Sequence, residues 1–242
     1  MGLGWLQKRR LVRDGYLRVP GLVPRERVDS ALALINRSLG ERGLPPDRLK
    51  ELRARSYCPE LVRAPEIQAL YAETPARALA EAAIGPVRPP EEGQIALRFP
   101  EGQPREIFPH IDGMYTPDNG VPAGTLVHFT ALLGVFLSDV PGPQAGNLTV
   151  LPGSQRILEA HFRQHGTGAL TNLPPLGPCR PRPLLGRAGD VVLAHYALAH
   201  AAAANLSPHI RYAVFFRLYH ADHERFGTGP LTDLWGQWQG LR

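Results

Sequence analysis

Two polar residues at the end of an apolar stretch constrain the fold more than any other feature of this chain. His110 and Asp112 are separated by one residue and are followed directly by Gly113. Ile107 to Asp112 is predicted to form a strand, in which successive side chains point to opposite faces. The imidazole and the carboxylate would then share a face, roughly 6–7 Å apart along the backbone. Both could therefore reach one metal ion as neighbouring ligands.

A second apolar stretch, far downstream, carries the groups that would complete such a site. Residues 189–200 are apolar and short enough to form a buried strand that ends at His200. After a turn rich in small residues, a β-branched and aromatic strand is predicted from Arg211 to Tyr219. If the turn centres near Asn205, Arg211 lies opposite His200 or one residue away. Two histidines and one carboxylate are the ligand set of non-haem Fe(II) oxygenases.

The order and spacing of these residues resemble the phytanoyl-CoA dioxygenase family of Fe(II)/2-oxoglutarate oxygenases. His200 lies 88 residues after Asp112 and eleven residues before Arg211. The run GNLTVLPGS, from Gly146 to Ser154, looks like a family motif, and the segment 14–22 is similar to the family's opening. The resemblance covers most of the chain. It rests on the ordered set, because His-x-Asp alone is a weak signal.

The resemblance implies an Fe(II)- and 2-oxoglutarate-dependent dioxygenase (hydroxylase) acting on a small molecule, with succinate and CO2 as co-products. The catalytic metal ligands would be His110, Asp112 and His200, which leave positions for 2-oxoglutarate, the cosubstrate, and for O2. Arg211 would bind the distal carboxylate of 2-oxoglutarate in a bidentate, charge-assisted pair. Asp112 argues against the halogenating relatives, which lack that carboxylate. Many members have a hydroxyl where this chain has Ala202, so another donor such as Thr130 would have to substitute.

His195 competes with His200 for the third ligand position. Five residues separate the two, so on one continuous strand they face opposite sides and cannot both enter the site without a bulge. The eleven-residue step to Arg211, taken from the resemblance, selects His200. His195 is then expected to be a packed histidine behind the site.

Parity along the predicted strands adds further candidates for contacts with 2-oxoglutarate or substrate. In the strand predicted from Gln94 to Phe99, Gln94 and Arg98 share one face and the other face is apolar. In the strand predicted over 125–138, Thr130 belongs to the face that also carries a histidine and a glycine. The opposite face is purely apolar and should pack under helices. Arg217 has the same parity as Arg211 and could meet substrate or form an ion pair at the core edge.

The remaining histidines carry no metal-site signal of their own. His161 and His165 have helical metal spacing, on a helix expected from Ser154 to residue 164 with Ser154 as its cap, but no third ligand is near them in the sequence. His220 and His223 begin the C-terminal part of the chain. All four are expected to be solvated.

Helices precede strands along the chain, which predicts an α+β fold. Together with the resemblance, this gives a double-stranded β-helix, a jelly-roll or cupin-like core, with the N-terminal helices packed on one sheet. A single domain is expected over 1–242: a helical part at about 1–90, a β-helix core at about 91–220, and a loose tail at 221–242. The Pro- and Gly-rich loop 113–124 follows the first two ligands and is expected to form a lid or substrate rim.

Charge and composition exclude several classes. The net charge of +5 comes from scattered arginines, which fits an anionic substrate or cosubstrate and, without a basic helix, argues against nucleic acid as a partner. No apolar run reaches the about 18 residues of a membrane span, and no signal peptide is recognised. The two cysteines lack metal spacing and are expected to be reduced. A cytoplasmic monomer or small homo-oligomer is therefore expected.

Two alternatives from other classes stay open. The chain could be a non-catalytic β-helix protein that uses its pocket only for binding. It could also be a cupin-like metal isomerase or lyase, which usually adds a further His or Glu ligand and has no need of Arg211. A 2-oxoglutarate titration with Fe(II) in the absence of O2 would separate these classes.

Overall fold

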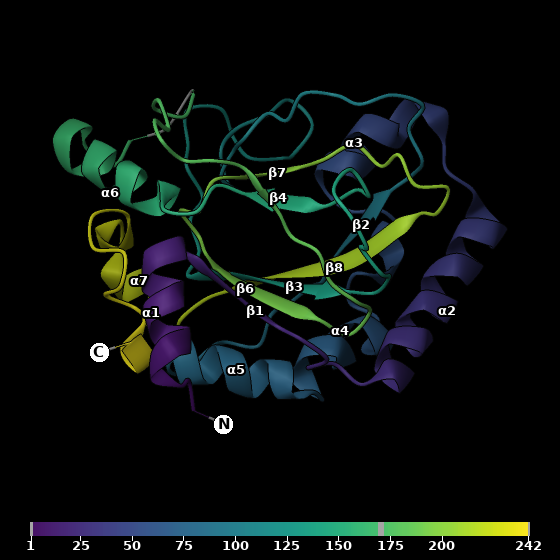
Figure 1. The fold of residues 1–242 in the computed structure, drawn as a ribbon, viewed down its shortest axis with the longest axis horizontal. Coiled ribbons are helices and arrows are strands. Elements are labelled where there is room, and N and C mark those ends of the chain that lie inside the picture. Colours follow the sequence, from purple (N-terminus) through teal and green to yellow (C-terminus); the bar gives the residue numbers. More distant parts are fainter. Residues whose placement is uncertain (1, 169–171, 242) are drawn as a thin grey trace.

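Two antiparallel β-sheets lie one above the other, and most helices cover the outer side of the larger sheet (Figure 1). The computed structural model describes residues 2–168 and 172–241. The five-stranded sheet has the order β1-β6-β3-β8-β2, and the three-stranded sheet has the order β5-β4-β7. From β3 onwards the chain passes repeatedly between the sheets. This is the wiring of a double-stranded β-helix, and the predicted fold class is confirmed.

The elements follow the predicted order of helices first and strands later. The strands are β1 (Tyr16–Val19), β2 (Gln94–Arg98), β3 (Ala131–Phe136), β4 (Leu148–Val150), β5 (Arg182–Pro183), β6 (Val191–His195), β7 (His200–Ala202) and β8 (Arg211–Leu218). The helices are α1 (Trp5–Asp14), α2 (Arg25–Arg42), α3 (Leu49–Ala54), α4 (Pro65–Ala72), α5 (Pro75–Ile84), α6 (Ser154–His165) and α7 (His223–Phe226). Short 3₁₀ segments lie at η1 (Pro46–Arg48), η2 (Pro59–Leu61), η3 (Gly229–Leu231) and η4 (Gln239–Leu241).

The period-two alternation of the strands separates two hydrophobic cores. Leu133 of β3 and Phe216 of β8 point toward the helices and join the first core, which also takes in the buried face of α2. Leu132 and Phe136 of β3 point the other way and join the second core, between the sheets. Each fully buried side chain of this kind contributes roughly 1.5–3 kcal/mol through removal from water. The expected apolar face under helices is therefore confirmed for β3.

The predicted hairpin from residue 189 to Tyr219 is wrong. The chain turns after His195, where the His195 Nδ1 accepts a hydrogen bond from the Ala197 N–H (3.0 Å), and β7 continues in the other sheet. His200 is paired with Val150 of β4. β8 lies in the larger sheet, where Arg211 is paired with Arg98. Arg211 therefore lies across the sandwich from His200, not beside it in a hairpin.

The predicted strand over 125–138 is also shorter than expected. A bend at Thr130 precedes β3, so the alternation of the strand does not extend to residues 127–130. The Thr130 N–H donates to the carbonyl of Leu218 (2.9 Å), and its hydroxyl faces the C-terminal segment. The helix predicted from Ser154 is present, but Gly153 is its N-cap; the Ser154 hydroxyl accepts a hydrogen bond from the Ala199 N–H (2.9 Å). The irregular stretch predicted over 167–183 lies partly outside the described residues.

The C-terminal segment is packed against the body of the protein, not loose. Trp238 is 1% exposed, and its ring stacks on that of His195 with centroids 5.5 Å apart. His220 and His223, which were expected to be solvated, are buried in this packing. The segment lies beside α1 and α5 (Figure 1). It closes one end of the sandwich because Leu231, Leu234 and Trp238 there bury their side chains. Among the described helices, none is both long enough and apolar enough to cross a membrane.

Truncating the buried tryptophan should show how much this segment stabilises the fold. We expect Trp238→Ala to lower the free energy of unfolding by about 3–5 kcal/mol, because a large side chain leaves a cavity against His195. Urea denaturation followed by circular dichroism measures the change. Trp5→Ala is the matched control: Trp5 is 65% exposed, so a surface truncation there should cost less than about 1 kcal/mol. Equal losses in the two variants would contradict the structural role of the segment.

Candidate metal centre

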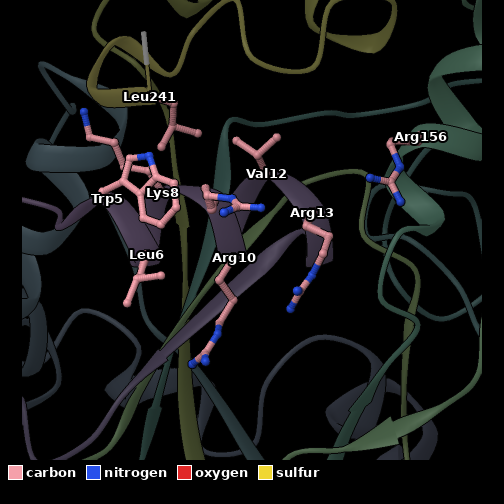
Figure 2. Close-up of a pocket in the computed structure, with 9 residues that line it drawn as sticks. Trp5, Leu6, Lys8, Arg10, Val12, Arg13, Arg156 and Leu241 are labelled. Carbon is pink, nitrogen blue, oxygen red and sulfur yellow. The ribbon is translucent and has the colours of Figure 1, made fainter.

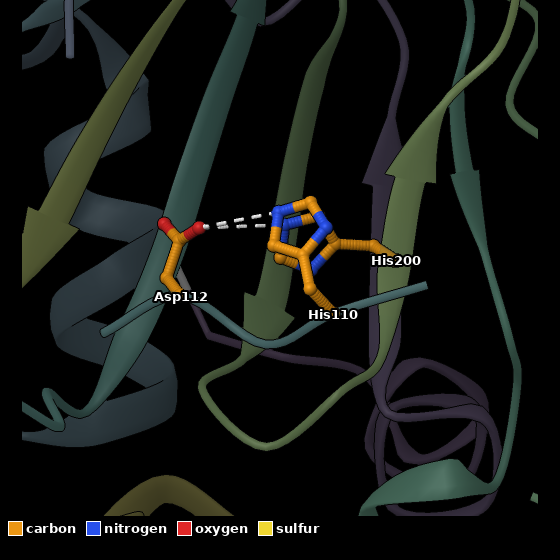
Figure 3. A group of neighbouring side chains, drawn as sticks. All are labelled: His110, Asp112 and His200. Atoms are coloured by element: carbon orange, nitrogen blue, oxygen red, sulfur yellow. Dashed lines mark ion pairs between the residues drawn. The ribbon is translucent and has the colours of Figure 1, made fainter. Parts of the chain in front are cut away.

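His110, Asp112 and His200 lie close together, with the carboxylate facing both imidazoles (Figure 3). One ligand atom from each lies within 4.8 Å of the others. The Asp112 Oδ1 is 3.6 Å from the His200 Nε2 and 3.9 Å from the His110 Nε2, and the two imidazole centroids are 4.7 Å apart. Ligand atoms bound to one ion at about 2.1 Å lie roughly 3 Å apart when adjacent, so small side-chain movements would bring these donors to bonding range.

The main chain fixes the two histidines relative to each other. The His110 N–H donates to the His200 carbonyl and the His200 N–H donates to the His110 carbonyl, each at 2.9 Å. The regular strand predicted over 107–112 is absent; this isolated bridge takes its place. Gly113 then turns the chain with φ +80°, and a Cβ at this position would lie 1.7 Å from the carbonyl oxygen of Val127. Only glycine allows the chain to leave so tightly after Asp112.

Asp112 and His110 have the protonation states that a divalent metal requires, whereas His200 is shifted toward its charged form. Burial would raise the pKa of Asp112, but the Arg217 guanidinium and the neighbouring His200 outweigh it and hold the pKa well below its ordinary value. The His110 side chain is half exposed at the pocket mouth, yet desolvation and the neighbouring His200 lower its pKa to about 4. Burial would lower the pKa of His200, but Asp112 outweighs it and raises that pKa.

A backbone carbonyl sets the orientation of the third donor. The His200 Nδ1 lies 3.0 Å from the Leu198 carbonyl oxygen, which places a proton on Nδ1 and leaves Nε2 toward Asp112. A donor set of two imidazoles and one carboxylate is typical of Fe(II) sites, whereas structural zinc sites are rich in thiolates. A search of the described residues for three or more His, Cys, Asp or Glu side chains with converging ligand atoms finds this group.

The three donors open into a pocket of about 820 Å³. The loop after Asp112 forms part of its wall, which supports the expectation that 113–124 is a rim. Asn119 braces this loop: its Oδ1 accepts hydrogen bonds from the N–H groups of Thr116 and Val121, both at 3.1 Å. Its Nδ2 donates to the carbonyl of Met114 (2.7 Å). The other walls come from β2, β8, α3 and β7.

Arg211 and Arg98 lie in the same pocket as two cations without a carboxylate. Arg211 is 6% exposed; its Nε donates to the Gly146 carbonyl (2.7 Å) and its Nη1 to the Ala96 carbonyl (3.0 Å). Burial and the like charge of Arg98 lower the pKa of Arg211 to about 9. Burial and the nearby Arg53 lower that of Arg98 to about 10. Within the described chain, no carboxylate lies within ion-pair distance of either. Both remain cationic at neutral pH.

Gln94 and Arg217 also line the pocket, whereas Thr130 does not. The Arg217 Nη2 lies 2.9 Å from the Asp112 Oδ2 and donates to the Gln94 Oε1 (3.1 Å). Arg217 was expected either to meet substrate or to form an ion pair, and the structure shows the ion pair. The Thr130 hydroxyl is 2.8 Å from the Gln237 Oε1 and accepts a hydrogen bond from the His220 N–H (2.9 Å). The bend before β3 turns the buried Thr130 away from the pocket, and Phe129 faces the pocket in its place. Thr130 therefore does not supply the donor that Ala202 lacks.

His195 lies away from the triad, as expected from its spacing. It is 3% exposed, and its Nε2 is 2.8 Å from the Leu234 carbonyl oxygen. Burial lowers its pKa to about 4, so the ring is neutral. Sequence reasoning did not single out Lys50 and Arg53, which reach the pocket from α3. The available signal was the density of cations over residues 48–55, but nothing in the sequence places α3 over the sheets.

A second hollow lies against α1 (Figure 2). Its described lining is cationic and apolar, and the residues include Trp5, Arg10, Arg13, Arg156 and Leu241. None of these lining residues carries a carboxylate or an imidazole, so no metal donor set is present there. The pocket at His110, Asp112 and His200 is therefore the candidate functional site.

Comparisons with known proteins agree with this geometry. Among solved structures, the 2-oxoglutarate-dependent carbocyclase SnoK from nogalamycin biosynthesis has a TM-score of 0.64 and 20% identity, over 89% of this chain and 83% of that one. HygX from Streptomyces hygroscopicus, with nickel and 2-oxoglutarate bound, has a TM-score of 0.59 and 20% identity, over 89% and 86%. The 2-oxoglutarate-dependent epimerase SnoN has a TM-score of 0.52 and 21% identity, over 87% and 80%.

At these identities the solved structures show the fold alone. No curated protein sequence matches the chain. The family described as phytanoyl-CoA dioxygenase (PhyH) matches residues 11–213, a span that includes the three donors and Arg211. The match covers most of the chain, and the fold of the structural neighbours agrees with it. The chain belongs to the phytanoyl-CoA dioxygenase family.

Proposed function

We propose that this protein is an Fe(II)- and 2-oxoglutarate-dependent dioxygenase that hydroxylates a small molecule. One observation carries the proposal: the metal donor set opens into the same pocket as Arg211, a buried cation without a carboxylate partner among the described residues. A desolvated guanidinium is costly unless an anion binds it. A metal site beside a carboxylate receptor is what a chelating dicarboxylic cosubstrate needs.

His110, Asp112 and His200 would hold Fe(II) and leave open positions for the cosubstrate and O2. The bound iron, with 2-oxoglutarate and O2, supplies the oxidising power, and succinate and CO2 are released. The protein contributes orientation. Asp112 stays ionised and His110 is neutral, so neither must lose a proton before it binds a metal. His200 is oriented by its contact with the Leu198 carbonyl, and it must lose a proton only when its ring is charged.

Arg211 would bind the distal carboxylate of 2-oxoglutarate. Its guanidinium is fixed in advance by the carbonyls of Gly146 and Ala96, so little side-chain entropy is lost on binding. Gly146 is required beside it: a Cβ there would lie 3.1 Å from the Arg211 Cβ and 2.8 Å from the Arg98 Cβ. Arg98 and Gln94, which line the same wall, are proposed as further contacts to cosubstrate or substrate.

We also propose that the substrate is anionic. Beyond Arg211, the pocket is lined by Lys50, Arg53 and Arg98, which form no ion pair among the described residues. The lining carboxylates are Asp112, which belongs to the donor set, Glu92 and Asp118, so cations outnumber them. Cations that converge on a concave surface raise the local concentration of an anionic ligand. Phe129 and Phe215 add apolar wall, which suits an acid with a hydrophobic body.

Two observations bear on the alternatives. Among the described residues no further His or Glu joins the three donors, which counts against a four-ligand isomerase or lyase. A protein that only binds ligand has no need of ionised Asp112 between two imidazoles. The fold is shared with a carbocyclase and an epimerase, so the reaction outcome needs its own test.

The proposal is tested in two stages. Adding 2-oxoglutarate to the Fe(II) protein without O2 should produce the metal-to-ligand charge-transfer band of a chelated complex. Succinate release in air is then measured against a panel of acidic, neutral and basic metabolites. We expect stimulation by acids with an apolar body, and one atom of ¹⁸O from ¹⁸O2 in the product. Product without ¹⁸O would exclude hydroxylation, and stimulation by basic compounds alone would exclude an anionic substrate.

Removing a donor should abolish metal-dependent turnover. We expect His110→Ala and Asp112→Ala to lose Fe(II)-dependent succinate release, because two donors do not hold the ion in place. His195→Ala is the matched control. This histidine is more buried than His200 and contacts Leu234 and Trp238, so the variant should be less stable while it keeps substantial activity. An inactive but folded His195→Ala together with an active His200→Ala would reverse the choice of the third ligand.

Replacing Arg211 should weaken the binding of 2-oxoglutarate and leave the binding of the metal unchanged. A charge-assisted hydrogen bond is worth about 1.5–3 kcal/mol, so Arg211→Gln should raise the Kd for 2-oxoglutarate about 10- to 100-fold. Titration of the charge-transfer band measures the Kd, and Mn(II) binding should be unchanged. Arg105→Gln is the control, because Arg105 pairs with Glu101 outside the pocket. An unchanged Kd in Arg211→Gln would contradict the assigned role.

A further inference from the structure

The two oxygens of Asp112 have different partners. Oδ1 faces both imidazoles, at 3.6 Å from His200 and 3.9 Å from His110. Oδ2 faces Arg217, whose Nη2 lies 2.9 Å away. Within the described chain, Arg217 is the cation at ion-pair distance from Oδ2. The carboxylate is therefore oriented with one oxygen toward the metal donors and the other engaged by the protein.

Arg217 is itself held in place. It lies on β8, paired with Leu132 of β3, and its side chain reaches across the pocket floor. The same Nη2 donates to the Gln94 Oε1 at 3.1 Å. Its guanidinium carbon lies 5.9 Å from the centroid of the Phe129 ring, within the range of a cation–π contact. A strand position, an amide and an aromatic ring thus fix the group that contacts Asp112.

We propose that Arg217 is a positioning residue that holds Asp112 as a one-oxygen metal ligand. The inference rests on the proposed metal centre and goes beyond it. A carboxylate with both oxygens free can bind a metal through both, which uses an additional coordination position. Because Arg217 engages Oδ2, only Oδ1 is offered to the ion. That position stays available for the cosubstrate or O2.

Two physical effects of Arg217 oppose each other at the metal. Its positive charge repels a cation and draws electron density from Asp112, which would weaken metal binding. Its ion pair with Oδ2 fixes the carboxylate, which strengthens binding. Groups that hold a ligand in this way typically contribute 10- to 100-fold in metal affinity. Orientation is the larger effect here, because Asp112 follows an irregular segment and precedes the Gly113 turn, so the backbone alone restrains its side chain little.

The experiment compares Arg217→Met and Arg217→Lys with the parent protein. Mn(II) affinity is measured by electron paramagnetic resonance, and the coordination of Co(II) by visible absorption, both without 2-oxoglutarate. We expect Arg217→Met to bind Mn(II) about 10- to 100-fold more weakly and to show an altered Co(II) spectrum. Arg217→Lys, which keeps a cationic donor, should recover much of the affinity and the parent spectrum. Parent-like affinity and spectrum in Arg217→Met, or tighter binding, would overturn the proposal.

Arg18→Met is the matched control for loss of an ion pair. The Arg18 Nη1 lies 2.7 Å from the Oδ2 of the buried Asp190, and the Arg18 side chain is 40% exposed, against 36% for Arg217. This variant should melt at a lower temperature and bind Mn(II) like the parent. If Arg217 were only structural, Arg217→Met would behave in the same way. A parent protein that binds no metal would refute the proposed centre itself, whereas equal binding by parent and Arg217→Met refutes only the role of Arg217.

Discussion

The antiparallel bridge between His110 and His200 is the interaction on which the site depends. These two residues are distant in the sequence, and their reciprocal backbone hydrogen bonds join an irregular segment to the edge of the smaller sheet. The bridge places both imidazoles beside Asp112 without help from a continuous strand. Main-chain hydrogen bonds define position more strictly than side-chain contacts because fewer rotatable bonds separate them from the fold. The positions of the two histidine donors are therefore set by the backbone.

The pocket keeps charged side chains although it is largely buried. Burial disfavours charge, yet the site keeps an ionised Asp112 and two arginines, Arg98 and Arg211. Asp112 is stabilised from within by Arg217 and the histidines. Among the described residues, Arg98 and Arg211 have no carboxylate at ion-pair distance, so an arriving anion would offset their desolvation. The fold thus pairs the charge of Asp112 with protein groups and leaves the charges of Arg98 and Arg211 free to bind an anionic ligand.

The larger sheet makes this arrangement rigid. Its outer face is covered by helices that bury Leu133, Phe216 and their neighbours, while its inner face presents Gln94, Arg98, Arg211 and Arg217 to the pocket. One face of each strand therefore supplies stability and the other supplies chemistry. The C-terminal segment closes an end of the sandwich through Trp238 and His195, away from the donors. This division allows the wall of the pocket to vary without loss of the hydrophobic core.

The sequence by itself determined the residue types of the site, the family and the faces of β2, β3 and β8, because alternation is a local property of strands. It also separated His200 from His195. Only the tertiary structure decided that the chain crosses between sheets after His195, that Arg211 pairs with Arg98, that Thr130 turns away at a bend, and that residues 222–241 are packed. The tertiary structure also decided that Arg217 forms an ion pair with Asp112. These outcomes depend on contacts between residues far apart along the chain, which local periodicity does not encode.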